Sequence, residues 1–395
     1  MAALFWITVV IGGLWILIFL SNTRELRRTP RLRPRPVGGI ARLPSVSILV
    51  PARDEEANIR RCLRSLMDLV HPDLEIIVID DRSSDQTATI VGRLARLDPR
   101  IRLIRLQSEP PAGWMGKCHA LHQGVLQGRP RGEWLLFTDA DTMHHPDSLA
   151  VALREALDHQ ADFFTLIPHL EAFNFWERLL QPTVAGLIAM FNRPGRINDP
   201  ERPDAFANGQ YILMHQEAYR SVGGHESVAG KVLEDVELAR VTKSLGLWIR
   251  LAVGVELFRT RMYPDLRSLL RGWGKNLFLL LDSRLSRVLA ATAAALLFSV
   301  WPAAAGIGAL VCLAGGQQPL PLEQLLIVTG IYAAVTGMQA GLRWMNRWYP
   351  VLAPLAPLAN LVALGILWHS TWLHLGRRAV TWKGRAVVDR REAGP

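Results

Sequence analysis

The chain has 395 residues, of which 50% are hydrophobic, and a formal net charge of +10. This length allows two or more structural units, and the apolar content predicts membrane segments. Three scattered cysteines, Cys62, Cys118 and Cys312, fit a reducing compartment without a disulfide framework and have no metal-ligand spacing. The excess basic residues lie beside apolar segments, and no zinc-finger spacing or recognition helix is present. The charge therefore favours a membrane surface and argues against nucleic acid as a partner.

The first 22 residues are predicted to be an N-terminal transmembrane anchor. Ala2 to Leu20 contain no charged residue and, at about 1.5 Å per residue, can cross a bilayer core of about 30 Å. A cleaved signal peptide is the alternative, but no basic region precedes the apolar run and no small-x-small site follows it. Residues 23–44 form a basic juxtamembrane linker with seven arginines from Arg24 to Arg42. The positive-inside rule predicts that the following domain is cytoplasmic.

Residues 45–262 alternate short apolar strands with amphipathic helices, the βαβ pattern of a parallel sheet. The second of these strands, LEIIVIDD, ends on Asp80 and Asp81, at the edge where such sheets bind ligands. Asp81 would accept hydrogen bonds from a base or ribose, or would cap the next helix. PARDEE follows the first strand in place of G-x-G-x-x-G, and no GxxxxGK[ST] loop occurs, which argues against NAD, FAD and P-loop chemistry.

The segment WLLFTDADTMHHPDSL places two carboxylates, Asp139 and Asp141, just after an apolar strand. Two such groups repel each other unless a cation lies between them, and Mg²⁺ or Mn²⁺ holding a diphosphate meets that need. A solvated acidic turn is the alternative. Upstream, the segment GWMGKCHALH places Lys117 after two glycines at a predicted helix start. A cation at this position can meet diphosphate oxygens. The alternative is that Lys117 is a plain surface charge. The histidines His119 and His122 are read as helix residues without a metal-binding partner.

PARDEE, VIDDRSSD, GWMGK and TDAD, in this order, make the chain similar to glycosyltransferase family 2, the inverting nucleotide-sugar transferases with a GT-A fold. The resemblance covers about Val46 to Trp273. It implies that Asp139 and Asp141 hold ribose and metal, with Asp141 closer to the metal. It also implies nucleotide-sugar contacts for a wider set of residues: Pro51, Arg53, Glu55, Asp80, Asp81, Lys117, Asp139 and Arg271.

KVLEDVELARVTKSLG places Glu234 and Asp235 at the start of a predicted helix, where simple capping is one explanation. The family resemblance instead implies a catalytic pair with Asp235 as the general base. Inversion at an anomeric carbon needs one base for the acceptor proton and a charge sink for the leaving nucleoside diphosphate. Downstream of the DAD segment, Asn208 and Gly209 would contact the sugar or only form a turn, and His225 stands where the family more usually has an aromatic residue.

An apolar helical run from Pro182 to Phe191 is too short to span a bilayer. It would lie in the membrane interface, which would favour a lipid acceptor, or pack against the sheet. Residues 263–287 are read as an interfacial amphipathic segment. The segment DLRSLLRGWGK resembles the place where processive synthases carry QxxRW but lacks the glutamine, which argues against processivity; Arg271 would still contact the diphosphate.

Residues 288–376 are predicted to form transmembrane helices, followed by a basic tail at 377–395. The three candidate segments are Val288–Ala314, Leu325–Leu342 and Val351–Leu375. Three full crossings would place the basic tail outside the cell, so either the third, proline-bearing segment re-enters, which is the preferred interpretation, or the positive-inside rule fails there.

These features together predict an α/β GT-A domain flanked by N-terminal and C-terminal transmembrane helices, in the plasma membrane with its catalytic domain in the cytoplasm. The expected function is metal-dependent, inverting transfer of one sugar from a nucleotide sugar, UDP-linked, to a lipid or lipid-linked hydroxyl. Through GWMGK, EDVELA and the few trailing spans, the chain resembles bacterial glycosyltransferases associated with hopanoids and carotenoids. Two alternatives are a processive polysaccharide synthase and a non-catalytic membrane scaffold that retains the fold.

Overall fold

The computed structural model describes residues 2–38, 42–316, 320–376, 380–382 and 385–387. The chain divides into two compact units. One unit is α/β and comprises 29–171 and 192–262 together with the C-terminal residues from 381; the other is helical and comprises 1–28, 172–191 and 263–380.

This division differs in three places from the predicted domain 45–262, one of them being the C-terminal residues from 381. The linker from residue 29 belongs to the α/β unit, because Arg31 forms a parallel bridge with Val253 and the Leu32 amide donates to the Val253 carbonyl at 2.9 Å. Residues 172–191 belong to the helical unit. The basic linker therefore includes an added piece of sheet edge.

The main sheet of the α/β unit has seven strands in the order β3-β2-β1-β4-β8-β6-β9. Strands β1 to β4 are parallel to one another, β8 is antiparallel to both β4 and β6, and β6 is parallel to β9. A second sheet has the order β5-β10-β7. The strands are β1 Val46–Ala52, β2 Leu74–Asp80, β3 Ile101–Arg105, β4 Trp134–Phe137, β5 Thr142–His144, β6 Phe163–Ile167, β7 His169–Leu170, β8 Ile212–His215, β9 Ile249–Val253 and β10 Phe258–Thr260.

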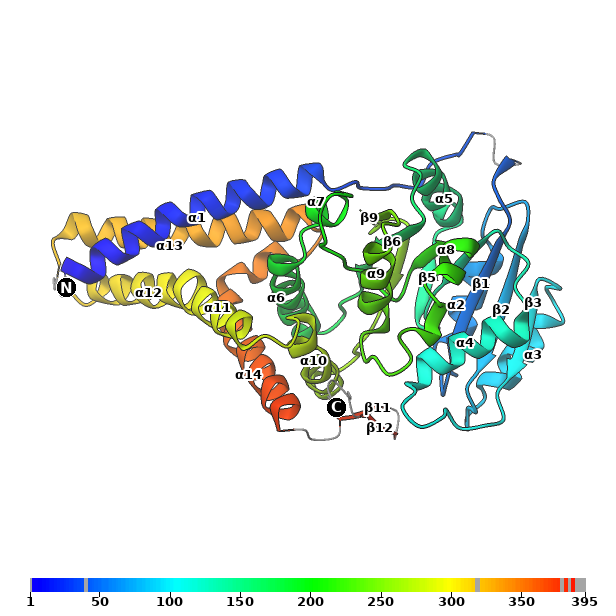
Figure 1. Cartoon of the computed structure of the whole chain (residues 1–395). Coiled ribbons are helices and arrows are strands. Elements are labelled where there is room, and N and C mark those ends of the chain that lie inside the picture. Colours follow the sequence, from blue (N-terminus) through cyan, green and yellow to red (C-terminus); the bar gives the residue numbers. More distant parts are fainter. Residues whose placement is uncertain (1, 39–41, 317–319, 377–379, 383–384, 388–395) are drawn as a thin grey trace. The chain divides into compact units, whose positions relative to one another are not determined.

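Helices cover both faces of the main sheet (Figure 1). Buried side chains of α2, α3 and α5 form one apolar core with the strands, and those of α4, α8 and α9 form the second. The strands between them are almost wholly apolar, as expected of a sheet that is buried on both faces. The helices are α2 Ile59–Met67, α3 Thr87–Ala95, α4 Gly116–Gly128, α5 Ser148–Asp158, α7 Pro194–Ile197, α8 Gln216–Ser221, a 3-10 helix Gly224–Glu226 and α9 Glu234–Ser244.

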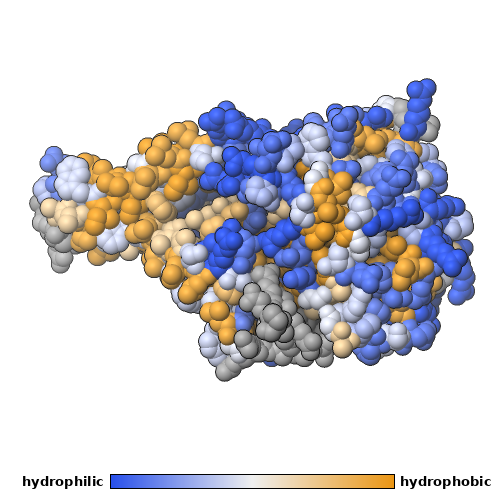
Figure 2. Space-filling view, viewed as in Figure 1, coloured by the Kyte–Doolittle hydropathy of each residue, from blue (hydrophilic) through white to orange (hydrophobic). Residues whose placement is uncertain are grey.

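The helical unit contains four helices in the described chain that are long and apolar enough to cross a membrane, at Ala2–Arg28, Leu285–Ala314, Leu322–Met345 and Pro350–Leu375. Within this unit, α1 and α13 run side by side (Figure 1). Large apolar side chains such as Trp6, Leu17 and Val311 remain exposed, and Figure 2 shows apolar side chains covering the surface of α1 and α12. A surface of this kind fits lipid better than water. The elements are α1 Ala2–Arg28, α6 Phe175–Phe191, α10 Leu266–Leu280, α11 Leu285–Ala295, a π-helical turn Leu296–Val300, α12 Trp301–Ala314, α13 Leu322–Met345, a 3-10 helix Pro350–Leu355 and α14 Ala356–Leu375.

The predicted run Pro182–Phe191 is the second half of α6. Leu179, Leu180 and Val184 are buried in a cluster with Leu277 of α10 and Leu367 of α14. The segment thus contributes to a core, and that core is made of helices. In the predicted tail, β11 Val380–Trp382 pairs with β12 Arg385–Val387, and the remaining tail residues lie outside the described part of the chain.

Candidate active site

The predicted site residues meet at the carboxyl edge of the parallel strands. Ala52 at the end of β1 is in register with Asp80 at the end of β2, and Leu49 of β1 is in register with Phe137 at the end of β4. The segments that follow these strands therefore leave the sheet on the same side, where open α/β sheets bind their ligands. The proline predicted for the nucleotide site, Pro51, is the penultimate residue of β1.

Asp81 is a buried carboxylate flanked by two arginines. It is 3% exposed, its Oδ1 accepts from Arg82 Nη2 at 3.1 Å, and its Oδ2 lies 3.7 Å from Arg53 Nη1. Burial raises its pKa, and the two guanidinium charges oppose that shift. Arg53 also donates to the Asp81 carbonyl oxygen at 3.2 Å. The predicted contact residues Arg53 and Asp81 are thus neighbours, and Arg82 is a partner that the sequence motifs did not single out.

Asp80 and Glu55 hold the loops on either side of this pair. Asp80 is 1% exposed and accepts from the Ser83 amide at 3.2 Å. The backbone amide of Glu55 donates to Thr87 Oγ1 at 2.8 Å, and its carboxylate accepts from Asn58 at 2.9 Å. The loop that contains PARDEE is therefore tied to the start of α3. Both acids have a structural role in this loop arrangement, and their contact with a nucleotide remains a prediction.

Lys117, the second residue of α4, joins two carboxylates. Its Nζ lies 2.7 Å from Asp139 Oδ1 and 2.9 Å from Glu234 Oε1. Burial acts to lower the pKa of Lys117, but the charges of Asp139, Glu234 and Asp235 outweigh it and raise that pKa well above its ordinary value. Lys117 is therefore a permanent cation between the DAD loop, residues 139–141, and the start of α9. The surface-charge alternative for this lysine is wrong.

Asp141 has an unsatisfied oxygen. Its Oδ1 is buried and has no hydrogen-bond partner among the described residues. Burial, with the charges of Asp139 and Glu55, raises its pKa to about 7. A buried carboxylate oxygen of this kind is a suitable ligand for a hard divalent cation. No group of three metal-ligating side chains is assembled in the described part of the chain, so a cation here would take further ligands from a diphosphate and water, which is how Mg²⁺ is commonly held.

Asp235 is held by backbone amides at the start of α9. Its Oδ2 accepts from the Gly209 amide at 2.7 Å, and its Oδ1 accepts from the Val236 amide at 2.8 Å. Burial, followed by the charge of Glu234, raises the pKa of Asp235 to about 7. Burial also acts to raise the pKa of Glu234, but the Lys117 charge outweighs it and lowers that pKa. The pKa values of these two adjacent acids thus differ: Glu234 is ionised at neutral pH, and Asp235 can exchange a proton near neutral pH.

A buried polar network supports the DAD loop. Thr138 Oγ1 lies 3.0 Å from Thr142 Oγ1 and from His144 Nε2, and it donates to the Gln210 carbonyl at 2.8 Å. Thr142 donates to the Asp139 carbonyl at 2.7 Å. Burial lowers the pKa of His144 to about 3, so the ring is neutral. The network links the loop that contains Asp139 and Asp141 to the segment next to Gly209. The residues TDADTMHH have no specific spacing signal that would predict it.

Arg271 lies in α10 of the helical unit, where its Nε donates to the Arg267 carbonyl at 3.4 Å. Its contact with a diphosphate stays a prediction.

His225, noted as unusual for the family, is buried with Nδ1 2.9 Å from the Tyr219 hydroxyl. Burial lowers its pKa to about 3. His119 is also buried, and its ring packs edge-on against Trp114 at 5.8 Å between centroids; the prediction that it is a helix residue is confirmed by its place in α4.

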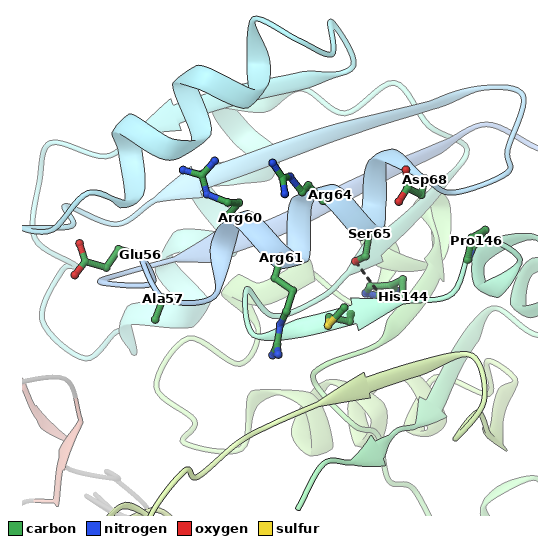
Figure 3. Close-up of a pocket in the computed structure, with 10 residues that line it drawn as sticks. Glu56, Ala57, Arg60, Arg61, Arg64, Ser65, Asp68, His144 and Pro146 are labelled. Carbon is green, nitrogen blue, oxygen red and sulfur yellow. Dashed lines mark hydrogen bonds between the residues drawn. The ribbon is translucent and has the colours of Figure 1, made fainter. Parts of the chain in front are cut away.

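A hollow of about 460 Å³ lies beside α2 and β5, and none of these carboxylates lines it. In Figure 3, Arg60 and Arg64 point to one side of α2 and Arg61 to the other, and Arg61 lies 3.7 Å from Glu171. The three arginines therefore do not converge on one ligand. The strand-edge carboxylates remain the candidate site.

Comparison with known proteins relates part of this chain to a described family. Residues 47–223 match the model for glycosyl transferase family 2. This segment is therefore similar to family 2 glycosyltransferase domains. The match begins at the second residue of β1 and includes Lys117 and both aspartates of the DAD loop, while Glu234 and Asp235 lie beyond its end.

The chain is also similar to curated proteins. The 4,4'-diaponeurosporenoate glycosyltransferases of Staphylococcus aureus strains USA300 and NCTC 8325 are each 26% identical over 243 residues, which is 59% of this chain. The alignment spans 60% of the length of those relatives.

The fold of the domain is found in a solved structure. A mannosyltransferase from Pyrobaculum calidifontis, solved in complex with GDP-Man and Mn²⁺, superposes with a TM-score of 0.53 at 18% identity. The superposition covers 92% of this chain and 98% of the other. It supports the predicted mixed α/β GT-A architecture with apolar helices at both ends of the chain.

Proposed function

We propose that this chain moves a single sugar, with inversion, from a nucleotide sugar to a lipid or lipid-linked hydroxyl, with a UDP-sugar as donor. One observation carries the proposal. Lys117 bridges Asp139 and Glu234 by 2.7 Å and 2.9 Å contacts, while Asp235 next to Glu234 is buried with a pKa of about 7. The arrangement provides one proton acceptor tuned to neutral pH and one fixed cation within a family 2 domain.

In this mechanism Asp235 takes the proton of the acceptor hydroxyl, and its two backbone hydrogen bonds fix the direction of its carboxylate. The acceptor oxygen forms a bond to the anomeric carbon as the bond from that carbon to the diphosphate oxygen breaks, so the nucleoside diphosphate leaves with the electron pair. A bound Mg²⁺ or Mn²⁺ would supply charge stabilisation for this leaving group. Asp141, through its unpartnered Oδ1, and Asp139 would hold that cation.

The donor would be held at the carboxyl edge of β1 and β2. Asp81 would accept hydrogen bonds from the base, and the charges of Arg53 and Arg82 oppose the rise in its pKa that burial causes. Lys117 is fixed by its two carboxylates close to where the diphosphate would meet the DAD loop. Pro51, Glu55, Asp80 and Arg271 complete the proposed nucleotide-sugar contacts.

Membrane helices and the relatives support a lipid acceptor. Four helices in the described chain can span a bilayer, and the relatives from Staphylococcus aureus are named for transfer to a carotenoid acid. The gathering of Asp139, Glu234 and Asp235 around Lys117 favours catalysis over a scaffold role, because a scaffold has no need to bring these acids together. Transfer of one sugar is favoured over processive synthesis by the missing glutamine in DLRSLLRGW. The protein would lie in the plasma membrane with its α/β unit in the cytoplasm, because arginine-rich linkers next to membrane helices are found mostly on the cytoplasmic side.

Sugar transfer by membranes that contain the full chain tests the proposal. Radiolabelled UDP-sugars and GDP-sugars are supplied with Mn²⁺ or Mg²⁺ to the wild type and to Asp235→Asn. We expect label in the lipid extract with the wild type and not with the variant. Label incorporated equally by both would remove Asp235 as the base, and label in polymer would favour a processive synthase.

A further inference from the structure

The last turn of α13 carries a buried cation. Arg343 is 6% exposed. Its Nη1 is buried without a hydrogen-bond partner, and its guanidinium forms no hydrogen bond or ion pair with any residue that the structure describes. A guanidinium stays charged in proteins, and burying an unpaired charge is costly. An anion outside the protein chain would remove that cost.

Acidic residues of the same helix cannot supply the missing charge. The sequence of α13, LEQLLIVTGIYAAVTGMQAGLRWM, contains one acid, Glu323, in its first turn. Twenty residues separate Glu323 from Arg343, which is about 30 Å along an α-helix. That distance is also about the thickness of a bilayer core, so the two charges lie at opposite ends of a membrane-spanning helix.

The residues after Arg343 indicate its depth in a bilayer. Trp344 is 72% exposed and Tyr349 39% exposed, and between them stand Arg347 and Trp348. Tryptophan and tyrosine gather at the level of lipid headgroups, and arginines extend to the same level. The Tyr349 ring is itself covered by the Arg178 guanidinium at 4.4 Å. Arg343, in the last turn of α13, therefore lies at the level of the lipid phosphates.

We propose that Arg343 binds the phosphate of an anionic phospholipid, whose charge compensates the buried guanidinium. The planar guanidinium can donate two parallel hydrogen bonds to phosphate oxygens, which an ammonium cannot. The lipid would be a structural ligand of the helical unit, so this proposal is independent of sugar transfer.

The test compares melting temperatures of the full chain in nanodiscs of phosphatidylcholine alone and of an equal mixture with phosphatidylglycerol. We expect the wild type to melt higher in the anionic mixture and Arg343→Met to lose most of that rise. The matched control is Arg347→Gln, which removes the same charge from an exposed position four residues later and should keep the rise. Arg343→Lys, which keeps the charge without the planar fork, should show an intermediate rise and decides the matter if the methionine variant does not fold.

Several results would overturn the proposal. These are a full rise in Arg343→Met or in Arg343→Lys, or an equal loss in Arg347→Gln. An equal rise on adding inorganic phosphate to phosphatidylcholine discs would show a site open to water and not a lipid site. In phosphatidylcholine alone, Arg343→Met should be at least as stable as the wild type; lower stability would show that the guanidinium has a partner within the protein.

Discussion

The backbone amide of Gly209 donates to Oδ2 of Asp235 at 2.7 Å, so a turn before β8 aims the proposed base at the start of α9. A Cβ on residue 209 would lie 2.9 Å from that same oxygen. We therefore expect Gly209→Ala to displace the Asp235 carboxylate and lower kcat about 100-fold, since misplacing a catalytic group by about 1 Å has an effect of this size.

The control for this variant is Gly92→Ala in α3, where an added Cβ meets nothing within 4 Å. It should keep wild-type kcat and gain a little stability from better helix propensity. Steady-state kinetics and thermal melts of both variants check the pair. Wild-type kcat in Gly209→Ala would mean that Asp235 does not need this hydrogen bond.

Lys117→Met should reduce both activity and stability, because it leaves the carboxylates of Asp139 and Glu234 facing each other in a buried site. Removing one partner of a buried ion pair typically costs about 3 kcal/mol. Adding Glu234→Gln to Lys117→Met should restore most of the stability and none of the activity. Chemical unfolding and sugar-transfer assays separate the two effects, with Lys231→Met as the control lysine; failure of the double variant to regain stability would contradict a charge-based explanation.

The pH dependence of kcat/KM should follow the proposed base. Asp235 must be ionised to take the acceptor proton, and its pKa is raised by burial to about 7. Activity should therefore rise as pH increases through about 7 and level off above it. Saturating Mn²⁺ would hold Asp141 ionised and so isolate the titration of Asp235. A flat profile between pH 6 and 8 would oppose this assignment.

Stabilisation by Mn²⁺ should depend on pH through Asp141. Burial raises the pKa of Asp141 from 3.8 to about 7, so the folded state binds this proton more tightly than the unfolded state does. The resulting stabilisation is present at low pH and is lost as pH rises from about 4 through about 7. Mn²⁺ should replace the proton, so its thermal stabilisation should be larger above pH 7 than below. In Asp141→Asn that stabilisation should vanish; an undiminished shift would place the metal elsewhere.

A reporter fused after Arg42 should be found in the cytoplasm. The basis is the arginine-rich linker that follows the apolar helix α1. Paired alkaline phosphatase and green fluorescent protein fusions distinguish the two compartments. Phosphatase activity at this position would reverse the proposed orientation and remove access to cytoplasmic nucleotide sugars.

Much of the fold was predictable because it follows local patterns. Apolar runs followed by acids predicted β2, which ends on Asp80, and β4, which ends two residues before Asp139. The charge-free runs predicted helices of membrane-spanning length. These patterns depend on residues that are close in sequence. The mixed α/β class and the family were therefore correct before any contact was known.

The contacts that define the site could not be predicted in the same way. Lys117 and Glu234 are far apart in sequence, and no local pattern says that α4 and α9 start side by side. The position of β8 also escaped prediction, because an antiparallel strand between β4 and β6 depends on the path of the whole chain. The roles of Thr138 and His144 depend in turn on that path, since their partners come from other elements.

The two units are also interleaved along the chain. The chain passes from one unit to the other at 28–29, 171–172, 191–192, 262–263 and 380–381. A protease that cuts any one of these connections would leave both parts covalently joined through the others, so catalytic fragments should not be shed from membranes by a single nick. A gene truncated to begin at residue 45 would likewise lose Arg31 and Leu32, which add to the edge of β9. The proposed transfer site and the membrane-spanning helices therefore cannot be separated by cutting the chain at one point.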